Sequence, residues 1–261
     1  MDLVVYILAG AAVGFAVGVT GVGGGSLMTP LLLLFGFPAH VAVGTDLLYA
    51  SITKAGGVMV HKRQGTIRWN IVFYLFAGSL PASLATVYVL HNYFPDSESY
   101  GHVLTSMLGI MLILTSIVLL FRKKILSESH EHNKGGFLAH LQTHSTRYTW
   151  MMGVLLGIMV TLSSVGAGAF GAAVLLLLYP RLPSINVVGT DLAHAVPLTL
   201  VAGTGHLFLG NVDFYLLGAL LIGSLPAIYV GTKVATRLPE KFLQPMLASM
   251  LLALGVKYAF F

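Results

Sequence analysis

The sequence has few charged side chains for its length. Of its 261 residues, 9% are charged and 56% are hydrophobic, whereas about a quarter of the residues in an ordinary soluble domain are charged. A soluble fold of this size could not cover its surface with so few charges without exposing large apolar patches. The shortage therefore excludes a soluble globular enzyme and predicts an all-α polytopic membrane protein that is surrounded by lipid.

The sequence also lacks cysteine, which excludes thiol catalysis, thiolate metal ligands and disulfides. Basic residues outnumber acidic ones by 14 to 9, but they lie in short segments between apolar runs, so we do not expect a nucleic-acid partner. No nucleophile is accompanied by a base and an orienting acid, and we expect neither an enzyme nor a cofactor. The N-terminal apolar run has no basic region before it, so we interpret it as a membrane segment and not as a signal peptide.

Ten apolar segments follow one another along the chain. Most have close to the roughly 20 residues that a helix needs to cross the membrane, but the segments at 27–35 and 171–179 are about half as long. We expect these two to be short broken or re-entrant helices. The other eight lie at 3–19, 40–60, 69–90, 101–121, 149–165, 186–206, 212–232 and 243–260.

The segments form two copies of one unit. Val-Gly-Thr-Asp-Leu at 43–47 recurs at 188–192, and Gly-Ser-Leu-Pro-Ala at 78–82 recurs at 223–227, both 145 positions later. Each copy holds five segments, and an odd number of crossings turns the second copy upside down. We therefore predict two inverted five-segment repeats. The first repeat covers 1–121, the linker 122–148 and the second repeat 149–261.

Basic residues indicate which side of the membrane each loop faces. Lys62, Arg63 and Arg68 follow the third segment, whereas the equivalent loop of the second copy, 207–213, has no Lys or Arg. The positive-inside rule then places the linker in the cytoplasm and the N-terminus outside. We interpret the linker histidines as part of a flexible segment, with a metal site as the weaker alternative. These histidines are His130, His132, His140 and His144.

Each half-length segment follows a glycine-rich loop, which leaves free backbone N–H groups at the positive end of a short helix. Such groups bind anions, so we predict that both loops contact an anionic substrate, with close helix packing by small residues as the alternative. Ser26 is also a candidate N-cap. The predicted contacts are Gly23, Gly24, Gly25, Ser26 and, in the second loop, Gly168.

Asp46, Lys54 and Asp191 are charged residues inside predicted spans, where each costs on the order of 2.5–3.5 kcal/mol. The two aspartates are repeat equivalents, and we interpret them as proton carriers or as organisers of a helix start. Tyr49 and His194 lie three residues after them on the same helix face, and we add His194 to the predicted proton-coupling residues. Lys54 is a candidate counter-charge for an anion, with Asp191 as its partner across the bundle. The alternative is a purely structural ion pair or N-cap.

The sequence resembles the sulfite exporter TauE/SafE family of membrane transporters over nearly its whole length. The resemblance implies a prokaryotic cytoplasmic-membrane protein that exports small sulfur-containing anions such as sulfite or organosulfonates. Asp46 and Asp191 stand where the family favours Ser, which indicates proton-coupled export or a different substrate. The residues that carry the resemblance are Gly21 to Gly25, Leu27, Pro30, Ala42 to Thr45, His61, Gly65, Gly189, Thr190, His206, Gly210 and Asn211 to Asp213.

The main hypothesis is thus a secondary transporter that binds a small sulfur oxyanion between the glycine breaks. Backbone N–H groups, Ser26, Thr45, Thr190 and Lys54 would hold the anion, and one repeat would rock against the other. A passive anion channel of the same architecture is the alternative, and a membrane metalloprotein that uses the histidines is a third, weaker one.

Overall fold

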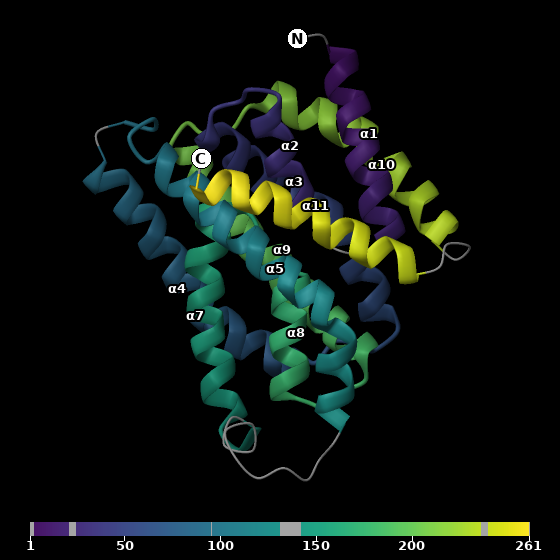
Figure 1. The fold of residues 1–261 in the computed structure, drawn as a ribbon. Helices are drawn as coiled ribbons and strands as arrows, with labels where there is room; N and C mark the ends of the chain where they lie inside the picture. Colours follow the sequence, from purple (N-terminus) through teal and green to yellow (C-terminus); the bar gives the residue numbers. More distant parts are fainter. Residues whose placement is uncertain (1–2, 21–24, 95, 131–141, 236–239, 261) are drawn as a thin grey trace.

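The computed structural model describes residues 3–20, 25–94, 96–130, 142–235 and 240–260. These residues form ten helices and no strand (Figure 1), which confirms the all-α prediction. The helices are α1 (Leu3–Thr20), α2 (Gly25–Leu34), α3 (Ala39–Arg63), α4 (Trp69–Tyr93), α5 (Gly101–His130), α7 (Ser145–Ser163), α8 (Ala169–Leu178), α9 (Ser184–Phe208), α10 (Phe214–Ala235) and α11 (Glu240–Phe260).

Several described helices have the length and surface of membrane spans. Four of them are long and apolar enough to cross a bilayer, namely α4, α9, Gly101–Phe121 of α5 and Phe214–Val234 of α10. Large apolar side chains such as Phe73 on α4 and Phe208 on α9 are 71% and 87% exposed. Such exposure is costly in water and costs nothing in lipid, so the helices and their surfaces together support a multi-pass membrane protein.

The short helices α2 and α8 fold back beside the helices that precede them. Each has ten residues, or about 15 Å, which is half the thickness of the hydrocarbon core. The hydroxyl of Tyr179, just after α8, bonds to Thr149 near the start of α7 at 2.7 Å. In the first copy, the ring of Phe37, just after α2, contacts Tyr6 near the start of α1, with 5.6 Å between centroids. The prediction of two short helices at these positions is therefore confirmed, and their re-entry from one side of the membrane stays a prediction.

The first helix of each copy packs against the fourth helix of the other, so that α1 contacts α10 and α7 contacts α4. Glycines line both contacts. A Cβ at Gly14 would meet Ser224 of α10, and one at Gly78 would meet the backbone around Trp150 of α7. Small residues let two helices approach closely in a membrane, where packing drives association. The repeated Gly-Ser-Leu-Pro-Ala motif lies at these contacts, and both helices continue through its proline.

Equivalent helices of the two copies pack antiparallel. In the pair α3 and α9, Leu48 lies against Gly203, and the Ser51 hydroxyl donates to the carbonyl of Val196 at 3.4 Å. In the pair α5 and α11, the Ser116 hydroxyl donates to the carbonyl of Ala248 at 2.8 Å. Figure 1 shows α11 crossing in front of α5, while α3 and α9 run through the middle of the bundle.

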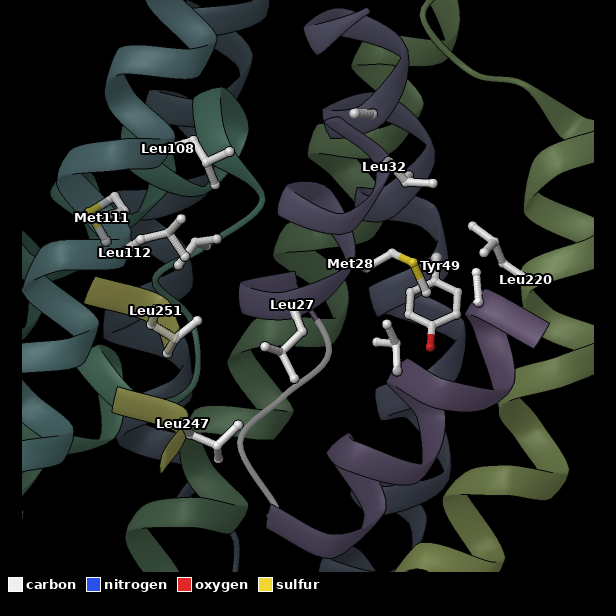
Figure 2. Packing of buried hydrophobic residues seen from close by; sticks show 14 of the residues in the cluster. Leu27, Met28, Leu32, Tyr49, Leu108, Met111, Leu112, Leu220, Leu247 and Leu251 are labelled. Carbon is white, nitrogen blue, oxygen red and sulfur yellow. The ribbon is translucent and has the colours of Figure 1, made fainter. Parts of the chain in front are cut away.

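Apolar side chains hold the short helix α2 in place. Figure 2 shows its residues Leu27, Met28 and Leu32 between neighbours from α3, α5, α10 and α11, including Tyr49 and Leu220. Leu32, Met28 and Tyr49 are fully buried. This packing holds α2 against α3, the helix that carries the buried charged residues Asp46 and Lys54.

The segment predicted as a linker, 122–148, contains helix at both of its ends. The helix α5 continues past its apolar run to His130, and α7 begins at Ser145. Residues 131–141, which include His132 and His140, lie outside the described residues. Among the described residues, no group of three potential metal ligands comes together.

Candidate functional site

Asp46 is fully buried on α3 and holds α2 at Thr29, the fifth residue of that helix. Its Oδ2 accepts hydrogen bonds from the hydroxyl of Thr29 and from the backbone N–H of Thr29, the latter at 3.2 Å. An acidic group near a helix N-terminus is favourable because it faces the positive end of the helix dipole. Of the two roles predicted for Asp46, this contact fits the organiser of a helix start, and proton carrying stays a prediction.

Asp191 occupies the equivalent position on α9 but has different surroundings. Its Oδ1 lies so close to Gly171, in the first turn of α8, that a Cβ there would collide with it. Val174 stands where the first copy has Thr29 and offers no hydroxyl. No hydrogen bond to Asp191 Oδ1 forms within the described part of the chain. The two carboxylates are thus equivalent in sequence and unequal in hydrogen bonding.

Lys54 reaches across the bundle from α3. Its side chain is buried, and Nζ donates a hydrogen bond of 3.2 Å to the carbonyl of Ala167 in the loop before α8. The charge that acts on it most strongly is Asp191, followed by Asp46. Lys54 is thus near enough to both carboxylates to feel their charge, and its ion pair with Asp191 stays a prediction.

Two further polar pairs lie beside these charges. His194 Nε2 is hydrogen-bonded to the Ser79 hydroxyl of α4 at 2.9 Å, and Lys54 also acts on His194. In the other copy, Tyr49 stands at the position of His194, and it lies next to Ser224, which stands at the position of Ser79. The polar surroundings are therefore duplicated, with the histidine replaced by a tyrosine.

Six buried polar atoms in this region have no hydrogen-bond partner among the described residues. Buried polar groups in proteins are nearly always hydrogen-bonded to protein or to water. The six residues that carry these atoms each interact with another of the six or with Lys54. They therefore form one cluster, which we call the central polar site. The six atoms are Asp46 Oδ1, Tyr49 Oη, Ser164 Oγ, Asp191 Oδ1, His194 Nδ1 and Ser224 Oγ.

The predicted glycine-loop contacts are only partly described by the structure. Gly23 and Gly24 lie outside the described residues. The helix α2 begins at Gly25, so Ser26 is its second residue and does not occupy the N-cap position. Gly168 is the N-cap of α8, with a φ of 141° that side chains rarely adopt, and it follows the carbonyl of Ala167 that accepts from Lys54. The second loop therefore borders the central polar site.

Thr45 and Thr190 are both buried, and their hydroxyls contact the opposite copy. Thr45 Oγ1 accepts a hydrogen bond of 3.1 Å from the backbone N–H of Asp213. Thr190 Oγ1 accepts one of 3.0 Å from the backbone N–H of Arg68, which is the equivalent position in the first copy. Substrate contact by these two threonines stays a prediction, because each hydroxyl already serves the loop that precedes the fourth helix of the other copy.

The glycine before each threonine makes these contacts possible. A Cβ at Gly44 would collide with the backbone of Asn211, and one at Gly189 would press on the ring of His61 and on Thr66. The Gly-Thr motif of each copy thus fits against the His-x-x-x-Gly loop of the other. We call these two reciprocal contacts, Gly44 and Thr45 with 206–213 and Gly189 and Thr190 with 61–68, the interlocks.

The interlocks differ in how closed they are. His206 is fully buried. Its Nε2 donates to the carbonyl of Thr161 at 2.9 Å, and its Nδ1 accepts from Asn211 Nδ2 at 3.1 Å. The Asn211 amide also donates to the hydroxyl of Tyr100 at 2.6 Å. His61 is partly exposed and bonds to Thr66 at 2.8 Å. The interlock at His206 is therefore closed around its histidine, and the one at His61 is partly open.

Sequence reasoning missed the serine and threonine hydroxyls in the central polar site and directly beside it. Ser79 and Ser224 recur within a repeated pentapeptide, and this recurrence could have singled them out. Thr29 and Ser164 have no polar equivalent in the other copy, so no pattern in the sequence distinguishes them from the other hydroxyl side chains.

Comparisons with known proteins place this arrangement among membrane transporters. The family described as Sulfite exporter TauE/SafE matches residues 6–258. The chain is 36% identical over 251 residues to "Probable membrane transporter protein YjnA" of Bacillus subtilis, covering 96% of this chain and 97% of that protein. It is 30% identical over 261 residues to YdhB of the same organism, covering 96% and 98%. It is 26% identical over 270 residues to MJ0441 of Methanocaldococcus jannaschii, covering 97% and 94%. No solved structure gives a significant match.

Proposed function

Because the chain belongs to the sulfite exporter TauE/SafE family and is a membrane transporter, we propose that it is a secondary transporter of small sulfur-containing anions of the sulfite or organosulfonate class. Export is the proposed direction, with protons as the coupling ion. The observation that carries the proposal is the central polar site, where six buried polar atoms next to a buried lysine have no hydrogen-bond partner in the described part of the chain.

The chemistry of this site suits a small oxyanion. Lys54 supplies a positive charge, and the hydroxyls of Tyr49, Ser164 and Ser224 supply donors without a partner among the described residues. If Ser79 donates to Nε2 of His194, then Nδ1 carries the proton and is a fourth donor. A tetrahedral or pyramidal anion with three oxygens has acceptors for these donors, and it would satisfy groups that otherwise cost free energy when buried.

The two carboxylates provide the basis for proton coupling. When both are ionised, they outnumber Lys54, and their negative charge repels an incoming anion. Uptake of one proton removes that excess, so anion and proton would enter together. We assign the exchangeable proton to Asp191, because Thr29 already holds Asp46. His194, which lies on the same helix as Asp191 and interacts with Lys54, would relay the proton.

We propose that the two copies are inverted in the membrane and that they exchange access by rocking. Three observations support this proposal. The equivalent helices α3 and α9 pack antiparallel, and the contacts of α1 with α10 and of α7 with α4 are reciprocal. Basic residues follow α3 but are absent from the equivalent loop after α9. The cytoplasmic membrane, an outside N-terminus and a cytoplasmic linker belong to the same proposal.

The test is transport by purified protein in proteoliposomes. Vesicles loaded with sulfite, thiosulfate, sulfoacetate or sulfate are assayed for counterflow of labelled sulfite, with protein-free vesicles as the control. The proposal predicts saturable counterflow with at least one sulfur anion and stimulation by a proton gradient. Flux that rises linearly with concentration without saturating would instead identify a passive anion channel. Flux that ignores the proton gradient would remove the coupling assignment and leave the transporter assignment intact.

A further inference from the structure

A groove on the outer surface of the bundle lies between α7 and α8. Its volume is about 490 Å³. Its walls are apolar except for the Tyr148 hydroxyl, and several lining side chains are exposed, with Met151 50% and Leu155 39% exposed. The lining residues are Tyr148, Met151, Met152, Val154, Leu155, Ile158, Val174, Leu177 and Leu178. None of these residues belongs to the central polar site.

The groove exists because α8 is short and returns beside α7. The bond between Thr149 and Tyr179, together with the bond from the Gln142 amide to the carbonyl of Leu177 at 3.4 Å, ties the end of α8 to the start of α7. The groove runs along α7 from Tyr148 to Ile158, a rise of about 15 Å, and is closed on the other side by the second half of α8. This is the depth of the hydrocarbon of a single leaflet.

Two arginines lie at the end of the groove where α7 begins and α8 ends. Arg147 precedes Met151 by one helical turn, so it lies on the same side of α7 as the lining. Arg181 follows Leu178, the last residue of α8, by three positions. Both side chains are exposed. The groove thus has an apolar wall about as long as one leaflet is deep, and two positive charges lie at one end of it. This arrangement is complementary to an anionic phospholipid, which has an apolar acyl chain and a negatively charged headgroup.

We propose that this groove binds an anionic phospholipid, with one acyl chain along α7 and α8 and the phosphate near Arg147 and Arg181. The apolar walls and the matched depth account for the acyl chain. The arginines account for the anionic headgroup, since basic residues at a membrane surface attract anionic lipid. The unbranched side chains of Met151 and Met152 adapt to a flexible chain. The proposal does not depend on which anion the protein transports.

Native mass spectrometry of the intact protein tests the headgroup half of the proposal. The protein is titrated in detergent with dioleoylphosphatidylglycerol or with dioleoylphosphatidylcholine, which share their acyl chains. We expect a one-lipid adduct that favours phosphatidylglycerol over phosphatidylcholine. In an Arg147→Gln/Arg181→Gln variant, the ratio of the two affinities should fall by about fivefold for each arginine removed. The matched control is Lys62→Gln/Arg63→Gln, which removes two exposed charges at the end of α3 and should bind as wild type does. Equal binding of both lipids by the wild type would overturn the charge assignment.

Filling the groove tests the acyl-chain half. Leu155→Trp and, separately, Ile158→Phe place a bulkier side chain in the groove and should reduce the one-lipid adduct of both lipids. Ile117→Trp on the exposed side of α5 is the matched control. Each variant must first melt near the wild-type temperature without lipid. If one of the two groove variants does not, the other one is used for the test. Undiminished binding by a folded groove variant would overturn the proposal, even if transport is intact.

Discussion

The hydroxyl of Thr45 accepts a hydrogen bond of 3.1 Å from the backbone N–H of Asp213, and Thr190 accepts the equivalent bond from Arg68 at 3.0 Å. Each bond joins one copy of the repeat to the other. Two motifs that look like separate functional signatures in the sequence, Gly-Thr and His-x-x-x-Gly, are therefore two halves of one contact, and the contact occurs twice.

The first prediction separates the interlock role of the threonines from substrate binding. Thr45→Val keeps the shape of the side chain but leaves the N–H of Asp213 without its acceptor, which should destabilise the protein by about 1–3 kcal/mol. Thr45→Ser retains the hydroxyl and should lose much less. Unfolding in detergent gives the stability, and counterflow gives KM. A Val variant of normal stability but raised KM would instead mean that Thr45 contacts the substrate.

The second prediction concerns the two aspartates. Asp191→Asn should abolish the response of anion flux to a proton gradient, because the proposed exchangeable proton is gone. Asp46→Asn should retain part of that response. Proteoliposome flux with and without a proton gradient measures the difference. Equal flux in the wild type and in an Asp46→Asn/Asp191→Asn double variant would show that neither carboxylate carries protons.

Thr29 supplies a matched test of the structural role of Asp46. Thr29→Val removes the hydroxyl that donates to Asp46 Oδ2 and should cost about 1–3 kcal/mol of stability. The valine at the equivalent position, Val174, already shows that the side chain fits a short helix of this kind. Stability unchanged by Thr29→Val would contradict the assignment of Asp46 as an organiser of the start of α2.

The third prediction concerns Lys54. Lys54→Met removes the positive charge and leaves two buried carboxylates without it, so transport should fall at least tenfold and stability should also fall. Lys54→Met/Asp191→Asn should recover stability without recovering transport, because the unbalanced charge is removed while the anion still lacks its counter-charge. Lys62→Met, at an exposed position on the same helix, is the control. A folded Lys54→Met variant with wild-type flux would exclude Lys54 from the anion site.

The fourth prediction concerns the loop before α8. Gly168 has a φ of 141°, so Gly168→Ala should destabilise the protein by about 1–3 kcal/mol. Gly56 lies inside α3 with open space around it, and Gly56→Ala should stabilise the helix by up to about 1 kcal/mol. Opposite shifts of the melting temperature are expected. Equal shifts would show that the backbone of the loop is not constrained at Gly168.

Much of the fold could be predicted from the sequence, including the ten helices, the half-length of α2 and α8 and the duplication of the unit. The apolar segment predicted at 101–121 matches the candidate span of α5, but the helix itself continues to His130. A helix does not need apolar residues once it has left the membrane, so hydropathy could not locate its end. The site was predicted less completely. Asp46, Lys54, Asp191 and His194 do gather, but the hydroxyls of Tyr49, Ser164 and Ser224 that surround them did not enter the predicted site.

The sequence by itself determined that the chain lies in a membrane, because insertion depends on the hydropathy and length of each segment, and these are local properties. It also determined the repeat, because duplicated segments keep their spacing. Only the tertiary structure decided which copy each motif contacts. Whether Thr45 faces a substrate or Asp213, and whether Asp46 is held while Asp191 is not, depends on how helices far apart in the chain are rotated and packed. Those contacts are set by glycines and small side chains at helix crossings, and a linear pattern does not record the partner that a small residue admits.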